Sequence, residues 1–273
     1  MLSPLEILVV NDDGFDSKGI RSLAKMMSSF GHVTVVAPEF PQSATSTGIT
    51  MGRVLTLKKQ FKDESESWYS LDATPTSCVK FAFSDQHEGR RPDVVVSGVN
   101  HGSNAATAAN YSGTLGAVEE AALLGIPAIG VSVNTYDHDA DFSQVEAIFP
   151  DLFRKLLAVS SEGEGVFFNV NFPDPALGAV KGIRVARRGF GHWVKEYESV
   201  NPDECPGIEL KDGERLLRIA GNFVCDSPED DIAADINLLD EGYATIVAHN
   251  VDNSDERMHS ILRKKGFDED FTN

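Results

Sequence analysis

The sequence has few cysteines and no hydrophobic run long enough to cross a membrane. Its 273 residues include three cysteines, Cys78, Cys205 and Cys225, and none belongs to a C-x-x-C pair or a zinc-binding spacing. An odd number of scattered cysteines is typical of reduced thiols rather than of a disulfide framework. No apolar stretch approaches the roughly 18 residues that a membrane-spanning helix needs. We therefore expect a cytoplasmic protein without a membrane partner.

Positive charge is also scarce. The chain has 24 lysines and arginines against 42 aspartates and glutamates, which gives a formal net charge of -18 at pH 7. Such a surface repels the phosphate backbone of nucleic acids and anionic lipid headgroups. A nucleic-acid polymer is not expected as a partner. A small phosphorylated substrate is compatible with this charge, because a metal ion and backbone amides can bind phosphate locally.

Several catalytic motifs are missing. No G-x-S-x-G elbow is present, so a serine hydrolase of the α/β type is not expected. The G-x-G-x-x-G fingerprint is absent after the first strand, which argues against a dinucleotide-binding enzyme. Neither H-E-x-x-H nor the P-loop pattern occurs.

The hydrophobic pattern that is present predicts an α/β fold with a parallel core. An apolar run from Glu6 to Val10 is followed by helically spaced apolar residues from Ile20 to Phe30, and then by a second apolar run from His32 to Ala37. This is a β-α-β unit, whose two strands are parallel with a right-handed crossover. Further buried strands are predicted at Asp93–Ser97 and Ile126–Val133.

The tail from about residue 181 onward differs in composition. Short strands are predicted at Glu209–Leu210 and Arg215–Ile219, and Asp212-Gly213 between them is a typical hairpin turn. Another short strand is predicted earlier, at Arg53–Lys59. We interpret residues 1–273 as one domain, with a core at about 1–180 and a hairpin and C-terminal extension at about 181–273.

Two adjacent carboxylates stand where the first strand stops. Asp12 and Asp13 follow Asn11 directly and precede Gly14. Ligands of open α/β sheets bind beyond the carboxyl ends of such strands. Adjacent acids in a partly buried cleft repel each other unless a cation neutralises them, so we infer a divalent metal here. A turn followed by a helix cap is the simpler interpretation of the same four residues.

Other strand ends carry oxygen donors of the same kind. Ser43 follows the second strand, and Asn100 and Asn104 follow the strand at Asp93–Ser97. Carboxylate, hydroxyl and amide oxygens suit Mg²⁺ or Mn²⁺ better than zinc. His101 is the one histidine within these loops; it can assist proton transfer, but we expect it to face solvent.

A candidate anion site lies next along the chain. Tyr111-Ser112-Gly113-Thr114 leads into a predicted helix, whose exposed amides and positive dipole end favour an anion. Ordinary capping by Ser112 or Thr114 is the alternative. A metal site beside an anion site predicts hydrolysis of a phosphate ester.

These motifs, taken in order, resemble the SurE (survival protein E) family of metal-dependent nucleotide phosphatases. The resemblance runs from about residue 6 to residue 248. The matching segments are Asn11-Asp12-Asp13-Gly14, Ala37-Pro38 with Ser43, Thr74-Pro75-Thr76, Ser97-Gly98-Val99-Asn100 with Gly102 and Asn104, Tyr111-Ser112-Gly113-Thr114, Asn169-Val170-Asn171-Phe172-Pro173 and Asp240-Glu241-Gly242-Tyr243.

The resemblance implies a Rossmann-like three-layer core, a protruding hairpin and a C-terminal segment used in assembly as a homodimer or homotetramer. It implies hydrolysis of nucleoside 5′- and 3′-monophosphates with one Mg²⁺ or Mn²⁺ per subunit. By position, the family's metal ligands fall on Asp12, Asp13, Ser43 and Asn100. Its phosphate-binding and catalytic positions fall on Asn11, Asn104, Ser112, Gly113 and Thr114.

We assign Asp13 to orient or deprotonate the attacking water, with Asp12 as the alternative and Asn104 stabilising the developing charge. Direct attack by a carboxylate stays open. The chain departs from the family pattern at Ala44, at Ala73 and at Ala105–Ala108, and none of these positions is a proposed ligand.

Two functions of other classes compete with hydrolysis. A response-regulator receiver also begins with an apolar strand and an acidic pair, but it needs an aspartate after its third strand and a lysine after its fifth. In this chain the predicted strand at Asp93–Ser97 is followed by Gly98-Val99-Asn100, and the one at Ile126–Val133 is followed by Asn134. A non-catalytic nucleotide-binding subunit of the same fold is the other alternative.

Overall fold

The computed structural model describes residues 4–62, 66–84, 87, 89–137 and 139–268. The core elements follow one another as β1 (Leu5–Val10), α1 (Lys18–Met27), β2 (Gly31–Pro38), β3 (Leu57–Lys62), β4 (Glu66–Leu71), α2 (Pro75–Ala82), β5 (Val94–His101), the 3-10 helix η1 (Ala106–Tyr111), α3 (Gly113–Leu123), β6 (Ala128–Val133), α4 (Ser143–Val159), the 3-10 helix η2 (Ser160–Glu162) and β7 (Val166–Phe172).

The later elements build an appendage and return once to the core. They are the 3-10 helix η3 (Pro175–Leu177), β8 (Ile183–Val185), β9 (Gly191–Val194), β10 (Tyr197–Ser199), the 3-10 helix η4 (Pro202–Glu204), β11 (Leu217–Ile219), β12 (Asn222–Cys225), α5 (Asp235–Asp240), β13 (Ala244–Asn250) and α6 (Glu256–Lys264).

A nine-stranded sheet forms the middle layer, in the order β3-β4-β2-β1-β5-β6-β7-β13-β8. The six consecutive strands β4, β2, β1, β5, β6 and β7 of this order are parallel to one another. At the two ends of this group, β3 pairs antiparallel with β4 and β13 pairs antiparallel with β7. The predicted α/β class with a parallel core is thus confirmed.

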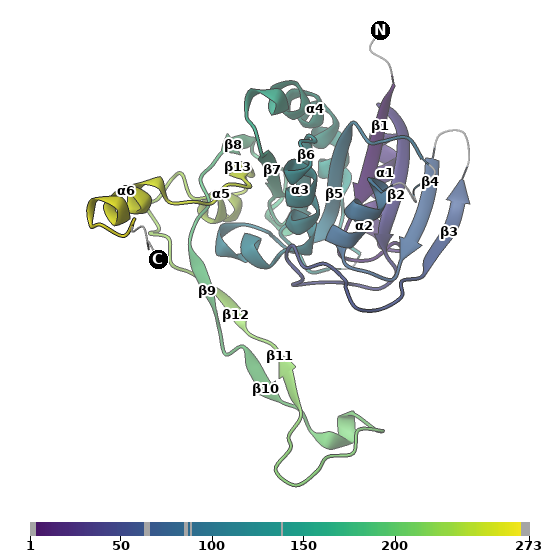
Figure 1. The fold of residues 1–273 in the computed structure, drawn as a ribbon, viewed down its shortest axis with the longest axis vertical. Helices are drawn as coiled ribbons and strands as arrows, with labels where there is room; N and C mark the ends of the chain where they lie inside the picture. Colours follow the sequence, from purple (N-terminus) through teal and green to yellow (C-terminus); the bar gives the residue numbers. More distant parts are fainter. Residues whose placement is uncertain (1–3, 63–65, 85–86, 88, 138, 269–273) are drawn as a thin grey trace, which may run out of the picture.

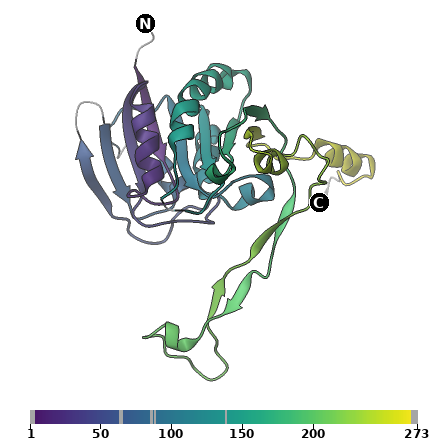
Figure 2. The same ribbon diagram turned by 180° about the vertical axis from the view of Figure 1, so that it is seen from behind.

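The two faces of the sheet bury two separate cores. Ile7 and Val9 of β1 point into the core shared with α1 and α4, while Leu8 and Val10 point into the core shared with α2 and α3. This alternation is the pattern of a strand covered on both faces. Figures 1 and 2 show the resulting three layers, with helices on either side of the sheet.

The strand order reverses between β1 and β5. The chain runs from β1 outward to β2 on one side, and later returns to place β5 on the other side, with Val10 opposite Ser97. Such a switch point is where open α/β sheets leave a crevice for a ligand. Residues that follow Val10 and Ser97 therefore meet at one place.

Residues 190–226, which we call the arm, project away from the body (Figures 1 and 2). The arm contains two short antiparallel ladders, β9 with β12 and β10 with β11. The hairpin expected around Asp212-Gly213 is wrong in detail: that dipeptide lies in a local turn between Lys211 and Glu214, within the long connection from β10 to β11.

Two short strands were also placed incorrectly. Glu209–Leu210 forms no strand, because both residues lie in an exposed part of that connection, away from any strand to pair with. The strand predicted at Arg53–Lys59 begins only at Leu57, where pairing with β4 begins.

Candidate functional site

The loop after β1 places three polar side chains at the switch point. Asn11 is fully buried, Asp12 is 4% exposed, and the side chain of Asp13 is 20% exposed. The Asn11 amide nitrogen donates to the Gly14 carbonyl at 2.9 Å and to the Ser17 hydroxyl at 2.8 Å. Both of its hydrogens are thereby used, and Ser17 in turn caps α1. Among the described residues, the buried oxygen Oδ1 of Asn11 has no hydrogen-bond partner.

Asp12 meets the start of α3. The Thr114 hydroxyl donates to Oδ1 of Asp12 at 2.6 Å. A Cβ added to Gly113 would lie only 2.9 Å from the Asp12 Cβ, so the glycine permits this close approach. The structure thus brings Asp12, Gly113 and Thr114 together, as the sequence predicts for a metal site beside an anion site.

Burial, followed by the nearby charge of Asp13, raises the pKa of Asp12 to about 6. Hydrogen bonds from the side chain and backbone of Thr114 act in the opposite direction but do not offset the loss of hydration. A buried carboxylate in this state gains stability from any cation that binds beside it.

Asp13 pairs with His101 at the end of β5. The His101 backbone N–H donates to Oδ2 of Asp13 at 3.1 Å, and the ring nitrogen Nδ1 lies 3.0 Å from the same oxygen. The His101 side chain is only 6% exposed and packs edge-on against Phe142. The expectation that His101 faces solvent is therefore wrong, because the β5 terminus turns its ring toward Asp13.

The remaining predicted metal ligands approach from two other strands. The Asn100 amide nitrogen donates to the Gly102 carbonyl at 2.7 Å, which leaves its amide oxygen as the atom to offer a cation. Ser43 is exposed, and its neighbour Gln42 donates its backbone N–H to the Asp12 carbonyl at 2.7 Å. This contact holds the loop that carries Ser43 against the β1 terminus.

Asn104 is held by a buried amide network. Its side chain donates to the Ser132 hydroxyl at 2.8 Å, its backbone N–H donates to Oδ1 of Asn171 at 2.8 Å, and its carbonyl accepts from Asn169 at 2.9 Å. Asn171 also donates to Asn169 at 2.8 Å. Sequence reasoning gave Asn169 and Asn171 no role at the site. A sequence pattern could have identified them: they are two polar residues at alternate positions of an otherwise apolar strand. Buried amides need hydrogen-bond partners, so such a pair indicates a polar network inside the fold.

Ser112 is a helix cap. Its hydroxyl accepts from the Leu115 backbone N–H at 3.1 Å, as the simpler interpretation expected. The side-chain oxygen is therefore engaged. What α3 offers an anion is the positive end of an 11-residue helix at Gly113 and Thr114.

The donor set fits a hard divalent cation. It combines two carboxylates with an amide oxygen and a hydroxyl, together with the unpaired acceptor on Asn11. In the part of the chain that the structure describes, no three His, Cys, Asp or Glu side chains are grouped as metal ligands. Two carboxylates completed by neutral oxygens and water are consistent with Mg²⁺ or Mn²⁺, which commonly keep several waters.

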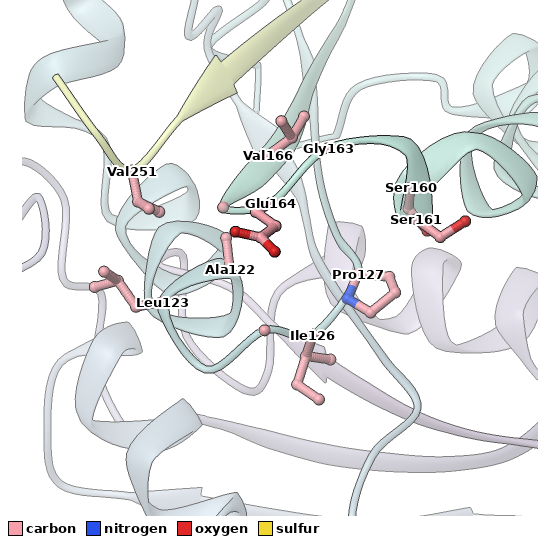
Figure 3. Close-up of a pocket in the computed structure, with 12 residues that line it drawn as sticks. Ala122, Leu123, Ile126, Pro127, Ser160, Ser161, Gly163, Glu164, Val166 and Val251 are labelled. Atoms are coloured by element: carbon pink, nitrogen blue, oxygen red, sulfur yellow. The ribbon is translucent and has the colours of Figure 1, made fainter.

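A separate pocket of about 600 Å³ lies where β6 and β7 begin (Figure 3). Its lining includes Ile126 and Pro127 before β6, Glu164 before β7, and Leu123 of α3. These residues precede the strands whose far ends face the crevice, so this pocket is distinct from the candidate site.

Comparison with known proteins decides the family. Residues 7–195 match the family model described as "Survival protein SurE". The 5'-nucleotidase SurE of Cytophaga hutchinsonii is 39% identical over 253 residues, which cover 92% of this chain and 93% of that protein. The chain belongs to the SurE family. The resemblance drawn from the ordered motifs is confirmed.

Other SurE proteins extend the comparison. The 5'-nucleotidase SurE of Christiangramia forsetii is 37% identical over 247 residues, 88% of this chain and 89% of its own length. The crystal structure of the SurE protein from Aquifex aeolicus matches with a TM-score of 0.74 and 29% identity, covering 95% of this chain and 99% of that one. Across the ranges described for this SurE-family chain, none of the helices has the length and apolar character needed to cross a membrane.

Proposed function

We propose that this chain is a divalent-metal-dependent phosphomonoesterase that hydrolyses nucleoside 5′- and 3′-monophosphates to nucleoside and phosphate. The observation that carries the proposal is the contact between the Asp12 carboxylate and the start of α3. It sets a cation site against an anion site, which is the arrangement a phosphate ester needs. The SurE relatives named 5'-nucleotidase support the same substrate class.

Asp12, Asp13, Ser43 and Asn100 would hold one Mg²⁺ or Mn²⁺. When bound, such an ion polarises a phosphoryl oxygen and lowers the pKa of a coordinated water. Asp13 orients or deprotonates the attacking water, and His101 fixes the direction in which its carboxylate points. Asp12 is the alternative base.

The phosphoryl group would lie between α3 and Asn104. The backbone amides of Gly113 and Thr114 offer hydrogen bonds and the helix dipole to its oxygens. Asn104 has one amide hydrogen left after its bond to Ser132, and it directs this hydrogen at the charge that develops as the ester breaks. Asn11 presents an acceptor rather than a donor, so its free oxygen suits the attacking water or the cation better than a phosphoryl oxygen.

The test is phosphate release from a panel of nucleoside 5′- and 3′-monophosphates and from p-nitrophenyl phosphate, with Mn²⁺, with Mg²⁺ and with EDTA. We expect metal-dependent turnover of nucleotides that is lost in Asp13→Asn while the fold is retained. Turnover in EDTA equal to that in metal would contradict the proposal. Nucleotide binding without release would instead identify a non-catalytic subunit. The receiver alternative is not favoured, because the chain belongs to the SurE family and β5 carries Asn100, not an aspartate, near its carboxyl end.

We also propose a homodimer or homotetramer built through the tail. The arm exposes apolar residues, with Tyr197 64%, Leu217 47% and Ile219 76% exposed, and its short strands leave open edges. Within this proposal the chain is one domain, with its core at about 1–180 and its extension at about 181–273. A monomer in light scattering at micromolar concentration would contradict the assembly. Three free thiols support a cytoplasmic location.

A further inference from the structure

We propose that Asp235 of α5 is a positioning residue that ties the base of the arm to the loop between Asn104 and Ser112, so that the two move as one unit. We call residues 104–112 the phosphate loop and residues 187–191 the arm base. The inference rests on the proposed function, because that function assigns phosphate binding to Asn104 at one end of this loop and to the start of α3 directly after its other end. It concerns residues that lie outside the metal and phosphate machinery itself.

Asp235 is completely buried and bridges two segments that are far apart in the sequence. Its carboxylate accepts the backbone N–H of Ala106, at 3.2 Å to Oδ1 and 3.0 Å to Oδ2. Oδ1 also accepts the Gly189 backbone N–H at 2.8 Å. Ala106 belongs to the phosphate loop and Gly189 to the arm base. One carboxylate therefore satisfies buried donors from both sides, and this is a charge-assisted arrangement.

Two further hydrogen bonds join the same two segments. The Thr107 hydroxyl donates to the Gly191 carbonyl, where the arm begins. The Arg188 guanidinium donates to Oδ1 of Asn110 at 2.9 Å. Three separate contacts thus connect the arm base to the phosphate loop, along most of the length of η1.

The geometry of the loop makes it dependent on these contacts. Ala106 has a φ of +51°, a conformation that a residue with a side chain adopts only when its surroundings hold it there. The near end of the loop is held to the body through the bonds of Asn104 to Asn171 and Asn169. Two residues later, the Asp235 carboxylate accepts the backbone N–H of Ala106 and so fixes the loop at a second point. Gly189 suits its position because an added Cβ would lie 3.1 Å from Asp235 Oδ1 and 3.0 Å from the Ser227 hydroxyl.

Removal of the carboxylate should therefore loosen both segments together and displace Asn104 and the start of α3 from the phosphoryl group. The Asp235 carboxylate also accepts the Ile236 backbone N–H at 2.8 Å, so Asp235→Asn keeps the shape but places an N–H donor where a backbone donor now points. Asp235→Ala removes both acceptors. Neither change touches the loop after β1, which carries the proposed metal ligands Asp12 and Asp13.

The experiment compares the full-length wild type with Asp235→Asn, Asp235→Ala and the matched control Asp226→Asn. Asp226 lies near the arm base as well, but its carboxylate is 48% exposed and pairs with His192. Three quantities are measured: the inhibition constant of inorganic phosphate, the dissociation constant of Mn²⁺, and amide hydrogen exchange in residues 104–112 and 187–191.

We expect both Asp235 variants to raise the phosphate inhibition constant about tenfold or more, as loss of an outer positioning group commonly does. Mn²⁺ affinity should stay unchanged, and exchange should rise in both segments together. Asp226→Asn should change none of the three quantities. Faster exchange in only one segment, or an unchanged phosphate constant in a folded variant, would overturn the proposal.

If the Asp235 variants do not fold, Thr107→Val and Arg188→Gln test the same coupling at its other two contacts. Each should then speed exchange on both sides of the contact that it removes, and an increase on one side alone would overturn the coupling. The exchange measurement needs no turnover. A wild type that hydrolyses no phosphate ester would refute the proposed function. A simultaneous rise of hydrogen exchange in the arm base and the phosphate loop of a variant would still show that the two segments are linked.

Discussion

The ring and the peptide N–H of His101 both contact one oxygen of the Asp13 carboxylate: Nδ1 lies 3.0 Å from Oδ2, and the peptide N–H donates to that same atom at 3.1 Å. Phe142 fixes the ring, with 5.2 Å between the two ring centroids. The histidine therefore sets the orientation of the carboxylate at the site.

This relationship predicts a role for His101 in metal affinity. His101→Ala should weaken Mn²⁺ binding about tenfold, because outer-sphere partners orient metal ligands. His101→Asn should recover part of the loss, since an amide also donates a hydrogen bond. Isothermal titration with Mn²⁺ at fixed pH measures both. His32→Asn is the control, because His32 pairs with Glu6 at the other end of β1. Equal affinity in wild type and His101→Ala would contradict the role.

Asp12→Asn should stabilise the metal-free protein and abolish its response to metal. The folded pKa of Asp12, about 6, exceeds its ordinary value of 3.8, so the metal-free fold loses stability as pH rises through this interval. At neutral pH the buried charge costs roughly 2–3 kcal/mol. Asparagine removes that cost and still accepts the hydrogen bond from Thr114.

The measurement is thermal unfolding of both proteins at pH 7, with EDTA and with Mn²⁺. In EDTA the variant should melt above the wild type, and Mn²⁺ should raise the melting temperature of the wild type alone. Wild-type affinity for Mn²⁺ should also fall as pH drops below about 6, because protons then compete for Asp12. An affinity that stays constant from pH 7 to pH 5 would refute the assignment of Asp12 as a ligand.

Gly113→Ala should impair phosphate binding and also lower the melting temperature. An added methyl group would lie 2.9 Å from the Asp12 Cβ and 2.9 Å from the Thr45 hydroxyl, so the start of α3 must shift. We expect kcat/KM for AMP to fall between about tenfold and 100-fold, as small misplacements of binding groups do. Crowding against the buried Asp12 side chain outweighs the better helix propensity of alanine at this first helical position, so the melting temperature should fall. Unchanged kinetics would show that the helix start does not contact the substrate.

His249→Phe should make the protein more tolerant of acid. Burial, and then the charge of Arg188, lowers the pKa of His249 to about 4 from its ordinary 6.5. The unfolded chain therefore binds a proton that the folded chain does not, and stability falls as pH drops through this interval, by up to about 1.4 kcal/mol per pH unit. Phenylalanine keeps the stacking on Phe167. Urea unfolding at pH 7 and pH 5 should show a smaller loss for the variant; an equal loss would exclude His249 as the cause.

The core of the fold was predictable because its strands have a strong local signal. The run from Glu6 to Val10 is apolar at every position after the first, which only a strand covered on both faces requires, and β1 has that environment. α2 begins with a similarly local signal, since Thr74 caps it and Pro75 is its first residue. The predicted strands also placed the loop residues of the site together, since the carboxyl ends of parallel strands lie at a common edge of the sheet.

The arm was not predictable to the same degree. β9 and β12 have four residues each, and each pairs with a segment far along the chain, so neither shows a recognisable period by itself. The hydrogen bonds from Ala106 to Asp235 also escaped prediction, because they join residues separated by more than a hundred positions. Such contacts depend on tertiary packing that local patterns do not encode.

The place of β13 in the sheet has a consequence for biosynthesis. This strand inserts between β7 and β8 and bonds to both, yet it is made of residues 244–250. During translation, the edge of β7 that pairs with β13 stays unpaired until more than seventy further residues have been synthesised. A nascent chain that stalls in this interval exposes a template for aggregation, so rapid synthesis of the tail or shielding by a chaperone protects the yield of folded protein.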